Sequence, residues 1–340
     1  MTKQGGISQF TIAVDAMGGD FAPGEIVKGA VQAARAFGIS LILTGVVKEI
    51  EKELSNLDTK GLQINITEAT DVIRDGEEAA FAVFRRPNNS VGVATRLVKD
   101  GKADAVVSAG NTGASMVCAV QYLGTLPGIE RPIAGGAYLS LASNMVMMDL
   151  GANVGVKPHQ LVNFAVAGSI YVRIFHGVEN PTIGLLSIGA EEGKGNEQTK
   201  EAYQLLKKSG LNFIGNVEGM DIVSGKANVI VCDGFIGNVL IKYSEGLGHA
   251  LSGWLGKELK DMVPVEVLEE TSQKLYRLLS PAVAMGGGPL VGVNGVAAVA
   301  HGNSCAAQVV GTIKNTIKAL ETGFVNKLRA ELEKFQTVIS

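Results

Sequence analysis

Aromatic residues, cysteines and positive charge are all scarce in this sequence, and each shortage argues against a class of protein. Only 5% of the 340 residues are aromatic, a single Trp is present, and the formal net charge is −3. Proteins that bind DNA or RNA commonly present a basic patch, and many also stack bases on aromatic rings. We therefore expect no nucleic-acid partner.

Long apolar segments and metal-binding motifs are also missing. No run of about 18 apolar residues occurs, as a membrane-spanning helix would need, and residues 1–6 lack the apolar core of a secretion signal. The four histidines are scattered and the cysteines follow no spacing pattern, so neither a metal site nor a disulfide framework is predicted. We expect a cytoplasmic protein without metal or cofactor, with three reduced core cysteines: Cys118, Cys232 and Cys305.

Glycine, in contrast, is abundant, with 44 residues, and 46% of the residues are hydrophobic. Short apolar runs alternate with segments of helical periodicity, which is typical of an α/β protein with a parallel sheet. The length suits one large α/β domain or two smaller ones, and no shift in composition marks a linker. We expect a single α/β catalytic domain over residues 1–340.

Two long helical patterns predict a hairpin, or arm, inserted into this domain at about 238–285. The first pattern covers residues 238–262, the second covers residues 265–279, and Pro264 separates them. Both carry apolar stripes that need a partner surface, and a second subunit is the simplest one. The stripes comprise Leu247, Leu251, Trp254, Leu255, Leu268, Leu275, Leu278 and Leu279.

A strand, a turn of small residues and a helix follow one another between residues 105 and 123. Residues 105–107 are apolar, and residues 114–123 have a helical pattern. Glycine lets the backbone approach a ligand closely, and the first N–H groups of a helix lack partners, so such a turn can bind phosphate. An ordinary connection in which Asn111 or Thr112 caps the helix is the alternative. The expected phosphate-binding residues are Ser108, Gly110, Asn111, Thr112 and Gly113.

Unusual polar residues follow most of the predicted strands. Because the carboxyl ends of parallel strands meet at one edge of an open sheet, where such sheets bind ligands, we expect these residues in one crevice. Each alone could instead cap a helix or bond to a glycine turn, but their concentration favours a site. The set comprises Asp15, Asn111, Asp149, Asn153, Lys194, Asp233, Asn238 and His301, and the turn after His301 adds Ser304.

Lys194 lies in a glycine-rich loop before a predicted helix at residues 198–208. Gly193 and Lys194 are similar to part of a nucleotide-binding P-loop, which needs four residues between its glycines and Ser or Thr after the lysine. Here three residues separate the glycines and Gly195 follows the lysine, so we reject a nucleotide site. A lysine in this position can stabilise an oxyanion, and a solvated surface lysine is the alternative.

Five motifs in this order resemble the bacterial phosphate acyltransferases of phospholipid synthesis. Each motif alone is weak, but five in order are specific, and the resemblance covers nearly the whole chain. The motifs are residues 14–20 (VDAMGGD), 108–113 (SAGNTG), 149–153 (DLGAN), 194–197 (KGNE) and 233–239 (DGFIGNV), with residues 300–304 (AHGNS) in addition.

The resemblance implies a fold, a reaction and partners. The implied fold is a three-layer α/β/α sandwich akin to the isopropylmalate dehydrogenase type. The implied reaction converts acyl-[acyl carrier protein] and inorganic phosphate into acyl phosphate and free acyl carrier protein, feeding phospholipid synthesis. A homodimer through the helical arm and loose, peripheral attachment to the inner face of the cell membrane are implied too.

The resemblance also makes Lys194 and Asn238 the expected catalytic pair. Phosphate is already a nucleophile, so the enzyme needs to position it and to stabilise the oxyanion that forms. Asp149 and Asp233 would orient these groups or take no part. Cys232 as a covalent nucleophile is a rival role, although its place in an apolar strand favours a buried thiol.

Two alternative functions stay open. One is a metal- and NAD-dependent decarboxylating dehydrogenase on the same fold, and the other is a non-catalytic phosphate-binding protein.

Overall fold

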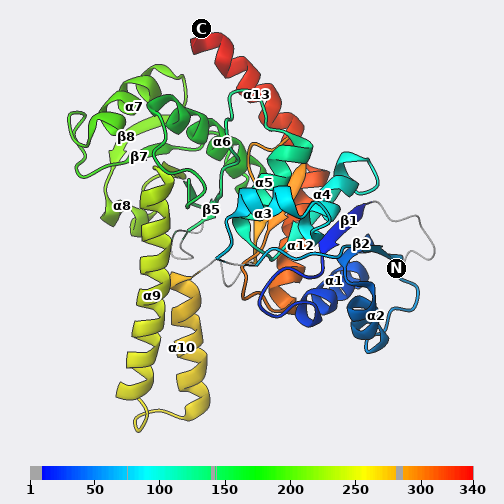
Figure 1. Cartoon of the computed structure of the whole chain (residues 1–340). Coiled ribbons are helices and arrows are strands. Elements are labelled where there is room, and N and C mark those ends of the chain that lie inside the picture. The colour runs from blue at the N-terminus through cyan, green and yellow to red at the C-terminus, as the bar shows by residue number, and fades with distance from the viewer. Residues whose placement is uncertain (1–9, 75, 139–141, 143, 281–285, 340) are drawn as a thin grey trace. The chain divides into compact units, whose positions relative to one another are not determined.

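The structure is a computed structural model, shown in Figure 1, in which strands, helices and a long helical hairpin are visible. It describes residues 10–74, 76–138, 142, 144–280 and 286–339. The expectation about residues 1–6 and the predicted end of the arm at 281–285 lie outside these ranges. Strands and helices alternate along most of the chain, which confirms the predicted α/β class.

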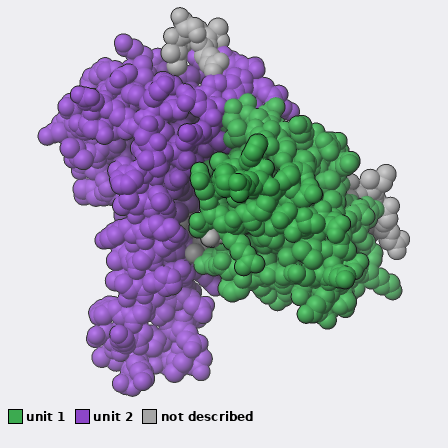
Figure 2. Space-filling view, in the orientation of Figure 1, with its two compact units in different colours: residues 1–125, 285–325 green, residues 126–284, 326–340 purple. Residues whose placement is uncertain are grey.

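The chain divides into two compact units, coloured separately in Figure 2. Unit 1 comprises residues 1–125 and 285–325, and unit 2 comprises residues 126–284 and 326–340. Each unit has its own sheet. This division was not predicted. Because two compact units need not fold independently, the expectation that residues 1–340 form a single catalytic domain stays a prediction.

Unit 1 is built on a six-stranded sheet in the order β10-β11-β4-β1-β2-β3, parallel except for the antiparallel pair of β10 and β11. Helices connect its parallel neighbours, as crossover connections require. The strands are β1 (Thr11–Asp15), β2 (Ser40–Gly45), β3 (Ile64–Glu68), β4 (Ala105–Ser108), β10 (Gly288–Pro289) and β11 (Val296–Val299). The helices are α1 (Gly24–Phe37), α2 (Val47–Ser55), α3 (Ala79–Arg85), α4 (Ser90–Lys99), α5 (Thr112–Leu123) and α12 (Ala306–Glu321).

The strands of unit 1 are apolar because helices cover them. Ile12, Ala13 and Val14 of β1 are fully buried, as expected for central strands of a parallel sheet. Ala13 belongs to a core cluster with Leu97 of α4 and Ala119 of α5. This packing fixes the carboxyl end of β1, where Asp15 lies.

Unit 2 contains a five-stranded sheet in the order β5-β6-β9-β7-β8, in which only the β5–β6 pair is antiparallel. The strands are β5 (Gly135–Ala137), β6 (Val146–Met148), β7 (Ile183–Leu186), β8 (Phe213–Val217) and β9 (Val229–Val231). The helices are α6 (Pro158–His176), α7 (Glu197–Lys208), α8 (Gly219–Ser224), α9 (Gly234–Glu258) and α10 (Val265–Leu279). Helix α13 (Phe324–Ile339) begins in unit 1 and continues in unit 2.

Helices α9 and α10 pack along each other and form the hairpin at the bottom of Figure 1. The Ser252 hydroxyl donates to the carbonyl of Ser272 at 3.0 Å. Leu251 and Leu255 are half-buried, whereas Trp254 remains 58% exposed. The hairpin therefore buries part of its own apolar surface, and the predicted subunit contact stays a prediction.

Four details of local structure differ from the sequence predictions. The apolar run at residues 290–293 predicts a strand, but the structure has only the two-residue β10 just before it, and Gly292 within the run has a φ of +89°. Helix α8 was not predicted, and α9 begins at Gly234, four residues before the predicted start. Cys305 is exposed at the start of α12, whereas Cys118 and Cys232 are buried as predicted.

Within the described residues, no helix combines the length and the apolar character that crossing a bilayer would require.

Candidate active site

Three parallel strands of unit 1 bring the predicted phosphate-binding residues to one rim. β1, β4 and β11 are neighbours, and Asp15, Ser108 and Val299 lie side by side in their register. The turns that follow the three strands therefore start at the same sheet edge. The backbone N–H of Asp20 donates to the carbonyl of Gly302 at 2.7 Å, which ties the first turn to the third.

A chain of hydrogen bonds organises this rim around Asp15. The Ser108 hydroxyl donates to Asp15 Oδ2 at 2.7 Å, and the Gly110 N–H donates to Ser108 Oγ at 3.0 Å. The first and second turns pack so closely that a β-carbon on Gly18 would lie 2.6 Å from the Gly110 nitrogen. Ser108 thus shapes the turn, and only glycine fits at position 18.

Burial raises the pKa of the Asp15 carboxyl, and hydrogen bonds from Ser90, Ser108, Met17 and Gly18 oppose this shift. Asp15 is 2% exposed. Burial therefore disfavours the charged form of this carboxyl, whereas the hydrogen bonds favour it.

The raised pKa of Asp15 has a consequence for stability. A carboxyl whose pKa is higher in the folded than in the unfolded protein adds to the free energy of unfolding at low pH. This contribution is complete below about pH 3.8 and is lost as the pH rises through the folded pKa. We expect protonation of Asp15 to stabilise the wild type as pH falls toward 4, and Asp15→Asn to lose this contribution. Thermal unfolding measured between pH 4 and pH 8 tests this, and an unchanged profile in the variant would contradict it.

Asn111 caps α5, as one of the two sequence interpretations proposed. Its side-chain oxygen accepts from the Ala114 N–H at 2.9 Å, and its Nδ2 donates to the Arg74 carbonyl at 3.3 Å. Thr112 and Gly113 form the first turn of α5. Capping does not exclude phosphate binding, because a helix start has several N–H groups without partners inside the helix.

The third turn of unit 1 contains His301 and Ser304. His301 is half-buried, and the Ser304 N–H donates to its carbonyl at 3.0 Å. Ser304 is fully buried, and its hydroxyl has no hydrogen-bond partner among the described residues. The turn therefore lies at the rim, but Ser304 is covered by protein in this conformation.

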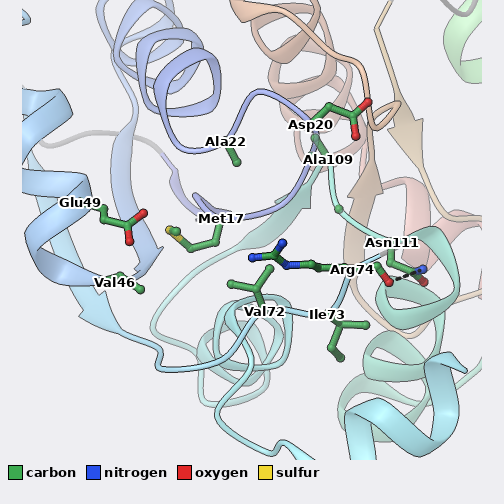
Figure 3. Close-up of a pocket in the computed structure, with 12 residues that line it drawn as sticks. Met17, Asp20, Ala22, Val46, Glu49, Val72, Ile73, Arg74, Ala109 and Asn111 are labelled. Atoms are coloured by element: carbon green, nitrogen blue, oxygen red, sulfur yellow. Dashed lines mark hydrogen bonds between the residues drawn. The ribbon is translucent and has the colours of Figure 1, made fainter. Parts of the chain in front are cut away.

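A cavity of about 530 Å³ opens beside the 108–113 turn within unit 1. Figure 3 shows the Arg74 side chain extending between Met17 and Val72, and a dashed line marks the bond from Asn111 to the Arg74 carbonyl. Arg74 was not predicted, because it lies in an irregular segment, six residues after the end of β3. The cavity is lined by Met17, Gly19, Asp20, Ala22, Val46, Glu49, Val72, Ile73, Arg74, Ala109, Gly110 and Asn111.

Unit 2 has a rim of the same kind, where three further predicted segments begin. β6, β9 and β7 are parallel neighbours. Asp149 follows β6, Asp233 follows β9, and the loop with Lys194 follows β7. The expectation of one sheet edge was therefore wrong: the polar strand ends belong to two sheets, one in each unit.

Asp149 organises the turn at residues 149–153. Its Oδ1 accepts from the N–H groups of Gly151 and Ala152, both at 3.1 Å. Its Oδ2 accepts from the Asn153 backbone at 2.6 Å and from Asn153 Nδ2 at 2.8 Å. Burial raises the pKa of Asp149, and these donors oppose the shift. All four bonds are internal, so Asp149 and Asn153 hold the turn together.

Asp233 caps α9 and joins it to two neighbouring segments. Its Oδ1 accepts from the Phe235 N–H and its Oδ2 from the Val156 N–H, both at 2.8 Å. Gln198, in the first turn of α7, donates to Asp233 Oδ2 at 3.3 Å and also to the Val156 carbonyl. Asp233 therefore orients the helix that carries Asn238.

Asn238 lies in the second turn of α9, against the 149–153 turn. A β-carbon built on Gly151 would lie 3.2 Å from Asn238 Cβ. At Gly237, the same addition would overlap the carbonyl oxygen of Asp149. Glycine at position 237 thus allows the start of α9 to pack directly on this turn.

Cys232, the rival candidate for a covalent nucleophile, is 4% exposed. Burial and the nearby carboxylates of Asp149 and Asp233 raise its pKa. A buried thiol that resists ionisation is a poor nucleophile, which agrees with the interpretation of Cys232 as a core residue.

Lys194 is exposed on the loop between β7 and α7. Its N–H donates to the Glu191 carbonyl at 3.0 Å, and its carbonyl accepts from Ser187 Oγ at 3.3 Å. Within the described parts of the chain, its ammonium group forms neither an ion pair nor a hydrogen bond. The loop backbone is ordered by these contacts, and the charged end is available to a ligand.

No group of three or more His, Cys, Asp or Glu side chains that could hold a metal ion occurs among the described residues.

Comparison with known proteins identifies the family of this chain. The family described as fatty acid synthesis protein matches residues 10–327. A phosphate acyltransferase from Pelotomaculum thermopropionicum is 42% identical over 328 residues, which is 96% of this chain and 96% of the relative. This chain belongs to the phosphate acyltransferase family. A phosphate acyltransferase from Desulfitobacterium hafniense, 43% identical over 330 residues, covers 95% of this chain and 98% of its own length.

Membership in the phosphate acyltransferase family confirms the resemblance stated from the five motifs and the predicted class of enzyme, an acyltransferase. Solved structures agree in fold. A phosphotransacetylase from Streptococcus pyogenes matches with a TM-score of 0.63 at 19% identity, covering 92% of this chain and 94% of that one. The EutD phosphotransacetylase from Staphylococcus aureus matches with a TM-score of 0.53 at 15% identity, with the same coverage.

Proposed function

We propose that this protein transfers the acyl group of acyl-[acyl carrier protein] to inorganic phosphate, giving acyl phosphate and free acyl carrier protein. Family membership is the observation that carries the proposal, because relatives above 40% identity over almost the whole chain are phosphate acyltransferases. Each unit's own rim offers groups of the kinds that such a reaction needs: helix starts, hydroxyls, an amide, and a lysine whose ammonium group has no partner among the described residues.

The proposed mechanism assigns one task to each group of residues. A phosphate oxygen attacks the thioester carbonyl carbon, the tetrahedral oxyanion collapses, and the carbon–sulfur bond breaks to release the carrier thiolate, which takes up a proton from the solvent. Backbone N–H groups at Thr112 and Gly113, at the start of α5, position the phosphate. Lys194 and Asn238 stabilise the oxyanion.

The remaining residues of the two rims hold the phosphate-binding turn and the start of α9 in place. Asp15 and Ser108 hold the phosphate turn at Gly110, while Asp149, Asn153 and Asp233 orient the start of α9. His301 and Ser304 complete the third turn of unit 1.

Further proposals concern fold type and location. We infer a sandwich of the isopropylmalate dehydrogenase type, since both sheets are mostly parallel and bear helices. We also infer a homodimer through α9 and α10, because Trp254 and much of α10 remain exposed. The expected location is the cytoplasm, peripheral to the inner face of the cell membrane.

A hydroxylamine trap tests the reaction directly. Purified protein is incubated with acyl-[acyl carrier protein] and phosphate, and acyl phosphate is captured as the hydroxamate. We expect product that depends on both substrates, with no requirement for metal or NAD. Absence of product combined with phosphate binding would favour a binding protein, and a metal-dependent change in NAD absorbance would favour a dehydrogenase.

Arg74 should contribute to phosphate binding. Its guanidinium lies along the cavity beside the phosphate turn (Figure 3) and makes no hydrogen bond of its own among the described residues. Loss of one charge-assisted hydrogen bond costs about 1.5–3 kcal/mol. We expect Arg74→Ala to raise KM for phosphate by about tenfold or more, measured at saturating acyl-[acyl carrier protein].

Glu49 lines the same cavity with the opposite charge and supplies the control. Glu49→Gln removes a repulsion, so it should leave KM for phosphate unchanged or lower it. If Arg74→Ala instead raises only KM for the acyl carrier substrate, the cavity binds that substrate and not phosphate.

A further inference from the structure

The loop that carries Lys194 is attached to a buried side chain from another strand. Asn216 lies in β8, and its Nδ2 donates to the carbonyl of Glu191 at 2.9 Å. The same carbonyl accepts from the Lys194 N–H at 3.0 Å. One carbonyl therefore links the strand amide to the backbone of the lysine.

This bond defines which end of the amide faces the loop. A carbonyl oxygen can only accept, so the group that faces Glu191 must be the NH₂ of Asn216. Asn216 is 4% exposed, and its Oδ1 has no donor among the described residues. A buried amide with only one of its groups satisfied adds less stability than an apolar side chain would in a strand. Its presence is therefore better explained by the loop than by the core.

Other contacts hold the loop on both sides of Lys194. Beyond Lys194, Asn196 caps α7 by accepting from the Thr199 N–H at 2.9 Å. Before it, Glu192 bonds to Gln204 and Lys207 on the surface of α7. These contacts fix the loop to α7. Ser187, directly after β7, donates to the Lys194 carbonyl at 3.3 Å, and Asn216 links the 191–194 turn to β8.

We propose that Asn216 is a positioning residue, which sets the conformation of the 191–194 turn so that Lys194 points at the oxyanion. The inference rests on the proposed role of Lys194. Because a displacement of about 1 Å can cost up to about 100-fold in rate, loss of the Asn216 bond should matter although Asn216 touches no substrate.

Two substitutions test the proposal. Asn216→Asp keeps the shape but places an oxygen against the Glu191 carbonyl, and Asn216→Val removes the polar group. We expect both to lower kcat by about 10- to 100-fold with KM for phosphate within twofold of the wild type. In a Lys194→Ala background, Asn216→Val should cause no further loss, because residues that act through one another are not additive.

Asn212 provides the matched control. It lies just before the other end of β8, and its Nδ2 likewise donates to a backbone carbonyl, that of Asn180, at 3.2 Å. We expect Asn212→Ala to retain the kcat of the wild type. A similar loss of kcat in Asn212→Ala, or full additivity of Asn216→Val with Lys194→Ala, would show that Asn216 has only a structural role and would overturn the proposal.

A readout without catalysis separates this inference from the proposed function. Lys194 is an exposed trypsin site, and cleavage after it requires the turn to open. Asn216→Val should speed cleavage at Lys194 by about tenfold while the unfolding temperature stays within a few degrees of the wild type. If Asn216→Val is cleaved at the wild-type rate, the inference is overturned even if the enzyme is active. If Asn216→Val is cleaved faster but the wild type makes no acyl phosphate, only the proposed function is refuted.

Discussion

Lys194→Ala should lower kcat by roughly 100- to 1000-fold, the usual cost of removing one donor that stabilises a transition-state oxyanion. The side chain is exposed and has no bonded partner among the described residues, so its loss should leave the fold intact. The hydroxamate assay measures turnover, and circular dichroism checks the fold. KM for phosphate should change little, because the phosphate turn is formed by other residues.

Lys200 is a suitable control for this experiment. It is an exposed lysine on α7, six residues beyond Lys194. Lys200→Ala should turn over as the wild type does. If Lys194→Ala also retains that activity, Lys194 has no part in the mechanism, and its loop is only a surface connection.

Asp149→Ala should destabilise unit 2 by about 3 kcal/mol or more. The carboxylate accepts four hydrogen bonds in a buried turn, and each buried donor left without a partner costs about 1–3 kcal/mol. Because α9 packs on this turn, activity should fall as well. The midpoint of urea unfolding, followed by circular dichroism, measures the loss.

A less buried aspartate, Asp221, serves as the comparison for the loss of stability. Asp221 caps the short helix α8 and pairs with Lys226 at 2.9 Å. Asp221→Ala should cost only about 1 kcal/mol, the usual value for a lost cap. An equally small effect of Asp149→Ala would mean that water replaces the carboxylate, and the turn would then not depend on Asp149.

The parts of this structure that local patterns determine could be predicted from the sequence. The apolar run at residues 105–107 predicted β4, and the Asn111 cap followed from its place before a helical pattern. The start of α9 was missed because Gly234 and Gly237 suggest a turn. In the structure these glycines allow close contact with residues 149–153, a contact between distant segments that no local pattern records.

Other parts of the candidate site depend on contacts between segments far apart in the chain. The division of the polar strand ends between two sheets follows from strand order, which the sequence does not display. Arg74 reaches the cavity from an irregular segment, and Asn216 resembles any polar residue of a half-exposed strand. Only the three-dimensional structure shows that one lines the cavity and the other holds the loop of Lys194.

The glycines of α9 fall into two groups with opposite value for protein engineering. At Gly237 no side chain fits, because its β-carbon would overlap the Asp149 carbonyl, so this position is closed to substitution. At Gly246, Gly253 and Gly256 an added β-carbon meets no described atom within 4 Å, and glycine inside a helix costs about 0.5–1 kcal/mol relative to alanine. Replacing these three glycines by alanine should therefore stabilise the hairpin end of α9 without changing the end that carries Asn238.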